Sequence, residues 1–303
     1  MEILERSTDL IGNTPLIRLG CVSPNVVAKL EQFNPLSSIK DRPAYYMVED
    51  GIKRGEIDDE TTIIEATSGN TGIGLASVCA AKDIDLVIAL PENVSEERKK
   101  LLKAFNVEIK LTSEEKGMEG AIEEAKKLNE EIDNSYWTRQ FENPANPKAH
   151  EETTGKEIWE QTNGQIDIFI AGVGTGGTLT GVTRYIKKHD CKQNFKAIGV
   201  EPNKSPVISG NRAGSHGIEG IGPGFVPKNL DTDLIDGMVR VKEEDAKNMA
   251  NRLAKNQGIL PGISSGANLY AADKIAKKQQ KSKLIVTVIP DTGERYLSTN
   301  LFD

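Results

Sequence analysis

The sequence has few cysteines and histidines, and neither residue type is spaced as a disulfide framework or a metal site requires. Its three cysteines, Cys21, Cys79 and Cys191, form no C-x-x-C pair in 303 residues. A disulfide framework and a cysteine-rich zinc site are therefore disfavoured, and each thiol is expected to be a small core or surface residue rather than a nucleophile. The three histidines lie far apart and include no H-x-x-x-H pair, so we predict no metal site.

Long apolar runs are absent as well. No stretch approaches the roughly 20 apolar residues that a membrane-spanning helix needs, and residues 1–20 lack the layout of a signal peptide, so we expect a cytoplasmic location. Strong positive charge is also missing: the net charge is −7, acids and bases are interspersed, and no Lys/Arg stripe favours nucleic-acid binding. The most basic short segments, residues 98–100 and 277–281, are interpreted as solvated helix faces.

What the sequence does contain is an alternation of short apolar runs and amphipathic stretches. The expected buried strands, rich in Ile, Val and Leu, are residues 62–66, 85–90, 107–111, 166–171, 197–201 and 284–289. The expected helices are residues 71–82, 95–104, 118–128, 179–188 and 243–257. This order predicts an α/β fold of two doubly wound, mostly parallel domains, which the Asn-Pro turns of residues 139–150 connect. Ligands in such folds bind at the carboxyl ends of the strands.

Residues 172–178 (GVGTGGT) form the first candidate site. They follow an expected strand and open an expected helix, where glycines let the backbone approach an anion and N–H groups bind phosphate. Gly172, Gly174 and Gly177 also fit G-x-G-x-x-G, and Glu201 ends the next strand, where a dinucleotide-binding fold would place its ribose-binding acid. The loop alone leaves a dinucleotide and a single phosphate equally open, whereas a purely structural turn would need fewer glycines.

Residues 34–42 (NPLSSIKDR) place Lys40 at the start of an expected helix, which Ser37 or Ser38 can cap. The positive end of the helix dipole and desolvation in a cleft both disfavour the ammonium form, and so favour a neutral amine that can form a Schiff base. Taken alone, a lysine beside Asp41 and Arg42 is more often an ordinary surface group.

Three further loops lead into helices. Residues 65–72 (EATSGNTG) offer hydroxyls, an amide and a row of backbone N–H groups, which suits a substrate carboxylate; N-capping by Ser68 or Asn70 is the alternative. Residues 262–267 and 291–298 are weaker signals of the same kind. Several anion-ready helix starts in one chain are hard to explain by capping alone.

Together these segments resemble the cysteine synthase (O-acetylserine sulfhydrylase) family within the fold-type II pyridoxal 5′-phosphate (PLP) enzymes, which share a tryptophan synthase β-like fold and include cystathionine β-synthase. The resemblance runs from residues 11–16 (IGNTPL) to residues 294–299 (ERYLST), in the family's order and spacing. It implies PLP in a cleft between the two domains and favours the phosphate interpretation of the glycine-rich loop. The implied domains are a smaller, mobile N-terminal domain of residues 35–145 with 1–11, and a larger C-terminal domain of residues 146–303 with 12–34 crossing over.

The resemblance also assigns roles to individual residues. Lys40 matches the catalytic lysine, which binds PLP as a Schiff base. The other expected cofactor ligands are Asn70 at the phenolic oxygen, Gly174, Thr175, Gly176, Gly177 and Thr178 around the phosphate, and Ser264 at the pyridine nitrogen. The expected substrate ligands are Thr67, Ser68, Thr71 and Gln140 at the carboxylate, and the loop that begins with Gly217, which would close over the amino acid.

The implied reaction is a β-replacement, in which O-acetyl-L-serine loses acetate to give an α-aminoacrylate and sulfide then adds to form L-cysteine. Residues 117–121 (GMEGA) lean toward the branch that accepts bulkier sulfur donors, and residues 219–225 (EGIGPGF) toward the other branch and cystathionine β-synthase. The alternative is a core-only cystathionine β-synthase or serine sulfhydrylase that uses serine or cysteine with homocysteine or sulfide. By resemblance only, we expect a homodimer and consider a serine acetyltransferase as a further partner, because some relatives dock one.

Overall fold

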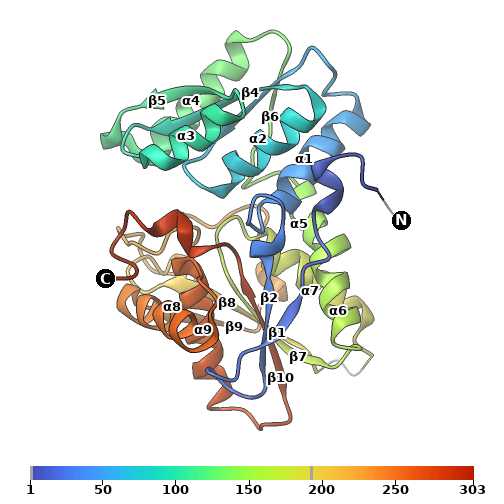
Figure 1. Cartoon of the computed structure of the whole chain (residues 1–303), viewed down its shortest axis with the longest axis vertical. Coiled ribbons are helices and arrows are strands. Elements are labelled where there is room, and N and C mark those ends of the chain that lie inside the picture. The colour runs from blue at the N-terminus through green and yellow to red at the C-terminus, as the bar shows by residue number, and fades with distance from the viewer. Residues whose placement is uncertain (1–2, 192–193) are drawn as a thin grey trace. The chain divides into compact units, whose positions relative to one another are not determined.

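The chain folds into two units, each with its own sheet and core, in a computed structural model that describes residues 3–191 and 194–303 (Figure 1). Unit 1 comprises Met1–Ile11 and Asn34–Asn146, and unit 2 comprises Gly12–Phe33 and Pro147–Asp303. Residues 1–2, which begin the predicted N-terminal domain, and residues 192–193 lie outside the described residues.

The sheet of unit 1 is parallel throughout its described strands, in the order β5-β4-β3-β6. The strands are β3 (Thr62–Ala66), β4 (Asp85–Pro91), β5 (Glu108–Thr112) and β6 (Ser135–Trp137). The helices are α1 (Asp41–Arg54), α2 (Asn70–Lys82), α3 (Glu96–Ala104) and α4 (Gly117–Glu131). Because side chains alternate along a strand, Ile63 and Ile88 pack with α1 and α2, while Ile64 and Val87 pack with α4. Helices cover both faces, so the central strands are apolar almost throughout.

The sheet of unit 2 has the order β1-β2-β10-β7-β8-β9, and its described strands are parallel except where β1 pairs with β2. The strands are β1 (Leu16–Arg18), β2 (Val26–Leu30), β7 (Ile166–Gly172), β8 (Lys196–Pro202), β9 (Gly237–Val241) and β10 (Leu284–Ile289). The α-helices are α6 (Lys156–Gln161), α7 (Gly177–His189), α8 (Glu243–Gln257) and α9 (Ile263–Ala276). The short helix α5 (Ala145–Ala149) contains the point of the chain at which unit 1 ends and unit 2 resumes.

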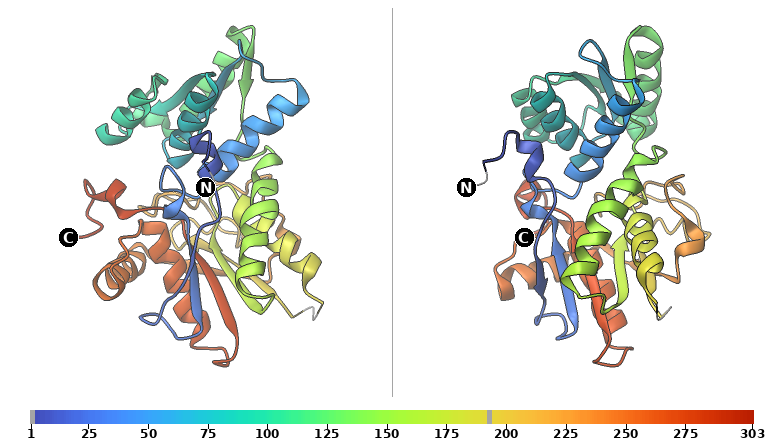
Figure 2. Two further views of the ribbon diagram at one scale, coloured as in Figure 1. Left: turned by 45° about the vertical axis from the view of Figure 1, so that its right-hand side comes forward. Right: turned by 90° about the vertical axis from the view of Figure 1, so that its right-hand side faces the viewer.

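Strand β8 shows how the two faces of this sheet are covered. Ile198 and Val200 belong to the core that α8 and α9 complete, whereas Gly199 faces Leu179 of α7. Figure 2 shows α7 and the α8–α9 pair on opposite faces of the sheet. A π-helix, His150–Gly155, lies between α5 and α6 and packs against α7. The short 3₁₀ helices are Ser7–Leu10, Glu31–Phe33, Glu114–Lys116, Thr232–Leu234 and Gly293–Tyr296.

The predicted fold class, two mostly parallel α/β sheets, is confirmed. Each predicted strand is present, with its ends shifted by no more than one residue. The sequence pattern did not single out β2, because this five-residue strand carries a charge at Lys29. Lys29 is fully buried there, and its Nζ lies 2.6 Å from Glu157 and donates to the carbonyl of Thr14. The charge is thus paired inside the unit, as a buried charge must be.

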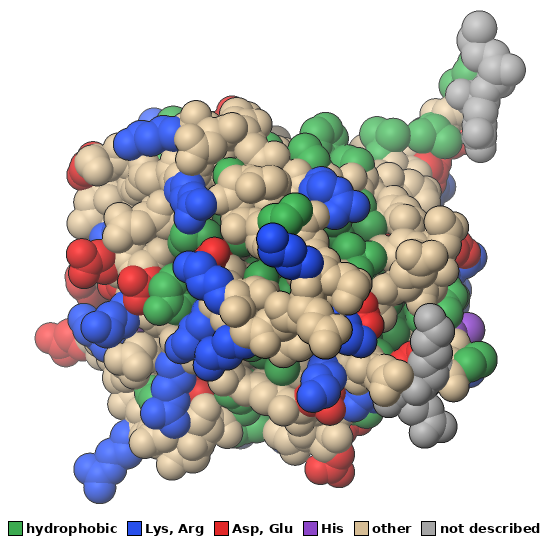
Figure 3. All heavy atoms as spheres, turned by 90° about the horizontal axis from the view of Figure 1, so that it is seen from below, with side chains coloured by type: hydrophobic (Ala, Val, Ile, Leu, Met, Phe, Trp, Pro, Cys, Tyr) green, Lys and Arg blue, Asp and Glu red, His purple; other side chains and the backbone are tan. Residues whose placement is uncertain are grey.

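Basic side chains are spread over one face of the molecule (Figure 3). The lysines at the end of α9 and just after it, Lys274, Lys277, Lys278 and Lys281, are exposed, and Lys277 lies 2.5 Å from the carboxylate of Asp273. In residues 3–191 and 194–303, no helix combines the length and the apolar character that crossing a membrane would take.

The close packing of α8 on α9 yields a stability prediction. A Cβ at Gly266 would lie 1.9 Å from the carbonyl oxygen of Ala246, so Gly266→Ala must push the two helices apart. We expect the free energy of unfolding to fall by about 2–3 kcal/mol, measured by denaturant titration. Gly20→Ala is the matched control, because a Cβ there meets no atom within 4 Å. Equal losses from the two variants would contradict this account of the packing.

Candidate active site

The residues predicted to act in binding or catalysis fall into two groups, one in each unit. Unit 1 contains Lys40, Thr67, Ser68, Asn70, Thr71 and Gln140. Unit 2 contains Gly174, Thr175, Gly176, Gly177, Thr178, Gly217 and Ser264. Most members of both groups follow the carboxyl end of a parallel strand, where ligands of α/β folds bind.

In unit 1, Lys40 is the N-cap of α1 and lies in a tight, internally bonded turn. The buried hydroxyl of Ser38 accepts the backbone N–H of Lys40 at 3.1 Å, and the carboxylate of Asp41 accepts the N–H of Leu36 at 2.7 Å. On the other side, Gly74 lets α2 approach so closely that a Cβ there would lie 3.1 Å from the carbonyl of Lys40. The half-buried lysine therefore extends from a fixed backbone at the positive end of a helix.

The loop of residues 67–69 connects β3 to α2, and three hydrogen bonds hold it. The N–H of Thr67 donates to the carbonyl of Ala89 at 3.1 Å, and the hydroxyl of Thr67 accepts the N–H of Gly69 at 3.1 Å. Nη1 of Arg98 donates to the carbonyl of Ser68 at 2.9 Å. The N-cap of α2 is Gly69, which has no side chain, so neither Ser68 nor Asn70 is the cap residue. The arrangement favours anion binding over capping as the use of this helix start.

Arg98 is a residue whose role the sequence did not reveal. It was interpreted as part of a solvated basic face, but its side chain is half-buried and holds the Ser68 carbonyl. The helical period of α3 gives no sign of this contact, because the partner is a backbone atom in another loop.

Thr71 and Gln140, both predicted to bind the substrate carboxylate, are in direct contact. The Thr71 hydroxyl donates to Oε1 of Gln140 at 2.6 Å, and Nε2 of Gln140 donates to the carbonyl of Ala66 at 3.3 Å. The backbone of Gln140 is held as well, since its carbonyl accepts from Nδ2 of Asn146 at 2.8 Å. We call the Thr71 hydroxyl and the Gln140 side chain the carboxylate clamp, after the role predicted for them. Their position is set by bonds within unit 1.

Glu65 lies directly beneath this clamp, and the sequence motif alone indicates no role for it beyond its place in the loop. Its side chain is 2% exposed and accepts hydrogen bonds from the N–H of Ala66 (2.8 Å), the N–H of Gln140 (3.0 Å) and the hydroxyl of Thr138. Burial raises the pKa of the Glu65 carboxyl to about 7, although these hydrogen bonds act in the opposite direction. A buried carboxylate whose partners are N–H and O–H groups is thus built into the base of the clamp.

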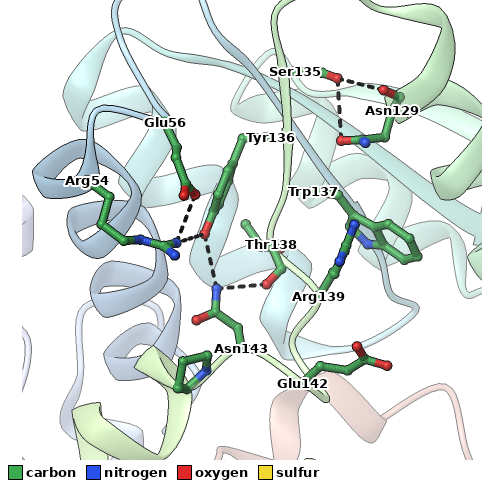
Figure 4. A pocket seen from close by; sticks show the side chains of 11 residues that line it. Arg54, Glu56, Asn129, Ser135, Tyr136, Trp137, Thr138, Arg139, Glu142 and Asn143 are labelled. Atoms are coloured by element: carbon green, nitrogen blue, oxygen red, sulfur yellow. Dashed lines mark hydrogen bonds and ion pairs between the residues drawn. The ribbon is translucent and has the colours of Figure 1, made fainter.

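The other side of the segment that carries Gln140 lines a pocket of about 580 Å³ (Figure 4). There Nδ2 of Asn143 donates to the Thr138 carbonyl at 3.0 Å and to the Tyr136 hydroxyl at 3.2 Å. Arg54 donates to the same Tyr136 hydroxyl at 3.0 Å, and Arg139 lies 5.0 Å from the centre of the Trp137 ring. These contacts brace residues 136–143 from the pocket side.

In unit 2, the predicted phosphate loop leads from β7 into the first turn of α7. Thr175 is buried and its hydroxyl accepts the N–H of Gly177 at 3.4 Å, while the Thr178 hydroxyl lies 3.2 Å from Nε2 of the buried His150. Gly176 has φ +82°, and a Cβ there would lie 2.8 Å from Leu230. Only glycine combines this backbone conformation with this contact.

Gly220 connects the phosphate loop to Ser264. Its carbonyl oxygen would lie 2.3 Å from a Cβ at Gly174, and its own Cβ would lie 3.8 Å from Oγ of Ser264, a buried residue in the first turn of α9. The segment predicted to close over the amino acid therefore packs against Gly174, and it passes close to Ser264.

Three further contacts, which the sequence did not indicate, hold the loop of residues 216–222. His216 accepts the N–H of Ile218 at Nδ1 (3.2 Å) and lies 2.9 Å from the Gly222 carbonyl at Nε2, which fits a neutral ring protonated at Nε2. The exposed Gly217 donates its N–H to Glu243 at 3.0 Å. His216 thus bonds to both ends of this loop, while Gly217 near its start is exposed.

The alternative interpretations of the sequence receive separate answers. The carboxylate of Glu201, considered as a ribose ligand, accepts the N–H of Ile208 at 3.0 Å and the hydroxyl of Ser209, so it is engaged in holding its own loop. Burial raises the pKa of the Cys79 thiol to about 12, which makes it a poor nucleophile. Within the described residues, no group of three or more His, Cys, Asp and Glu side chains could hold a metal ion.

The raised pKa of Glu65 predicts how stability depends on pH. Between about pH 4.5 and 7 the unfolded chain loses this proton and the folded chain keeps it, so the free energy of unfolding falls as pH rises and levels off above about 7. The contribution is about 3 kcal/mol. Glu65→Gln cannot ionise, so the stability of the native chain relative to this variant should decline by about that amount across the window. Denaturant titrations at several pH values provide the measurement, and parallel curves for the two proteins would rule the prediction out.

Comparison with known proteins confirms the resemblance. The family described as pyridoxal-phosphate dependent enzyme matches residues 7–291. Cysteine synthase of Staphylococcus aureus is 48% identical over 305 residues, covering 99% of this chain and 97% of that protein. The crystal structure of cysteine synthase from Entamoeba histolytica superposes with a TM-score of 0.95 at 41% identity, covering 99% of this chain and 91% of that one. O-acetylserine dependent cystathionine β-synthase from Helicobacter pylori gives a TM-score of 0.92 at 38% identity, covering 100% of both chains. This chain belongs to the family of pyridoxal-phosphate-dependent enzymes and, within it, to the cysteine synthases.

Proposed function

We propose that this enzyme forms L-cysteine from O-acetyl-L-serine and sulfide by PLP-dependent β-replacement. The single observation that carries the proposal is the carboxylate clamp of Thr71 and Gln140 at the start of α2, in the same unit as Lys40. Whole-length identity to cysteine synthases supports it further.

The donor set of unit 2 fits the phosphate of PLP. The loop offers backbone N–H groups at the start of a 13-residue helix and the hydroxyls of Thr175 and Thr178, and residues 172–178 contain no carboxylate to repel an anion. Gly174, Thr175, Gly176, Gly177 and Thr178 would hold the phosphate, and Ser264 would face the pyridine nitrogen. Because a serine hydroxyl is neutral, it would leave that nitrogen unprotonated. From unit 1, Asn70 would bind the phenolic oxygen and Lys40 would hold the aldehyde carbon.

When bound, PLP withdraws electrons from the α-carbon of an amino acid, so that a leaving group on the β-carbon can depart. The residues of this chain would prepare that event. Thr67, Ser68, Thr71 and Gln140 would bind the carboxylate and so orient the α-proton toward a base. Nζ of Lys40 would accept the proton, since the positive end of α1 disfavours its ammonium form.

The loop that begins at Gly217 would exclude water from the site. We propose that it closes over the bound amino acid, because its start is exposed while its base is stapled by His216. We also propose that residues 35–145 with 1–11 form the smaller, mobile domain and that residues 146–303 with 12–34 form the larger one.

A second candidate activity is cystathionine or sulfhydryl transfer with serine or cysteine as the first substrate. The likeness to the O-acetylserine dependent cystathionine β-synthase of Helicobacter pylori favours the cystathionine-forming part of this alternative, whereas that enzyme takes O-acetylserine rather than serine or cysteine. The sulfur donor would then be homocysteine or sulfide.

We further propose a cytoplasmic homodimer, with a serine acetyltransferase as a second partner. These statements rest on the resemblance alone. Light scattering should give twice the 33.0 kDa mass of the chain.

Paired substrate assays test the proposed reaction. Purified holoenzyme should turn over O-acetyl-L-serine with sulfide at least about tenfold more efficiently than L-serine with homocysteine, measured as kcat/KM for each pair. A reversed preference would replace the first activity by the second and leave the roles of the clamp and the cofactor ligands in place.

Lys40→Ala tests the lysine. The variant should lose the visible absorbance band of lysine-bound PLP, and turnover should fall at least about a thousandfold, because the α-proton has no base. Lys53→Ala is the control, since this exposed lysine of the same helix carries no assigned role. Retained absorbance and turnover in Lys40→Ala would refute the assignment.

A further inference from the structure

We propose that Glu65 is a positioning residue for the carboxylate clamp: its buried side chain fixes the backbone of Gln140 so that the Gln140 amide meets the Thr71 hydroxyl. The inference rests on the proposed function, in which this clamp binds the carboxylate of the amino acid. It assigns a purpose to a buried carboxylate that the reaction itself does not use.

Glu65 extends the pairing of β3 with β6 beyond its last backbone bonds. The ladder pairs Ile64 with Trp137, and the N–H of Thr138 donates to the Ile64 carbonyl at 3.0 Å. Beyond this point the Glu65 carboxylate holds the chain in place of backbone bonds, because one of its oxygens accepts hydrogen bonds from both the Thr138 hydroxyl and the Gln140 N–H. A side chain of β3 thus fixes the chain that follows β6.

The strain of the neighbouring residue shows why such a hold is needed. Arg139, between the two residues that bond to Glu65, has φ +49°, a left-handed conformation that a residue with a long side chain rarely adopts. The turn directs Gln140 back toward Ala66 and Thr71. Figure 4 shows the opposite side of this turn, where Asn143 holds the Thr138 carbonyl. The turn is therefore fixed from both sides.

The chemistry of the contacts explains a carboxylate at this position. The other oxygen of Glu65 accepts the N–H of Ala66 at 2.8 Å, so both oxygens face donors. A glutamine can keep one oxygen toward Gln140 but must then turn its NH₂ group toward the Ala66 N–H. A methionine of similar length offers no acceptor to either N–H group.

The test uses two probes without a leaving group on the β-carbon, L-alanine and L-alaninamide, bound to the holoenzyme and measured by calorimetry. They differ in whether the clamp has a carboxylate to bind. In Glu65→Met, the dissociation constant of L-alanine should rise about tenfold while that of L-alaninamide stays within about twofold. Glu65→Gln, which keeps an acceptor for Gln140, should recover most of the loss. KM for O-acetyl-L-serine should follow the L-alanine values, and KM for sulfide should not change.

Glu201→Met is the matched control. Glu201 is an equally buried carboxylate near a strand end, it also accepts backbone N–H groups, and it lies in unit 2. It should lose thermal stability comparably without changing the ratio of the two probe affinities. If Glu65→Met does not fold, Thr138→Val and Thr138→Ser replace it: the valine should weaken L-alanine binding selectively, and the serine should restore it.

The outcomes separate the two levels of the proposal. Suppose that the native enzyme binds L-alanine more tightly than L-alaninamide. If Glu65→Met then weakens the binding of both probes equally, or of neither, the positioning role of Glu65 is overturned. A native holoenzyme that binds both probes equally would instead overturn the clamp, and the role of Glu65 with it.

Discussion

Parallel strands end at a common edge, and both groups of functional residues depend on this constraint. In unit 1 the ends of β3 and β6 lie side by side, so the loop after β3 and the segment after β6 meet without a long connection. In unit 2 the ends of β7 and β10 are neighbours in the same way, and they support the phosphate loop and the start of α9. A helix start at such an edge supplies N–H groups and a positive dipole end, so anion binding follows from the topology before any particular side chain is considered.

Close backbone approach is the second requirement, and glycine meets it at defined points. The Gly220 carbonyl comes so near Gly174 that no Cβ would fit between them, and the same holds for Gly181 against the Pro147 carbonyl, with 2.1 Å to a Cβ. The first contact joins the amino-acid loop to the phosphate loop. The second seats α7 on the segment that carries His150, whose ring reaches Thr178. The residues proposed to bind the ligand therefore also take part in the packing of this unit, so a substitution there would affect both.

The sequence predicted those features that repeat or that stand beside one another in the chain. Runs rich in Ile, Val and Leu revealed β3, β4, β7 and β10, since strands covered on both faces are largely apolar. Strand β2 was hidden by Lys29, whose charge is compensated by a residue far along the chain. The sequence did not reveal the roles of Arg98, Glu65 and His216. Each side chain contacts a backbone atom, and neither the position nor the type of the partner residue indicates such a contact in the sequence. Role assignments for Lys40 or Ser264 came from resemblance, and geometry alone would have left them as capping residues.

Backbone strain offers an independent indication of where function lies. In the described part of the chain, the non-glycine residues with positive φ are Asn13, Ser37, Asp83, Asn106, Arg139 and Asn163. Asn and Asp tolerate the left-handed region, so four of these need no special cause. The other two are Ser37, three residues before Lys40, and Arg139, directly before Gln140. Such strain persists only where surrounding contacts fix the backbone, here the buried Ser38 hydroxyl in one turn and the Glu65 carboxylate in the other. The two unusual conformations thus lie just before the proposed base and the proposed carboxylate ligand. This is the pattern expected of a chain in which the placement of these two side chains outweighs the local conformational preference of the backbone.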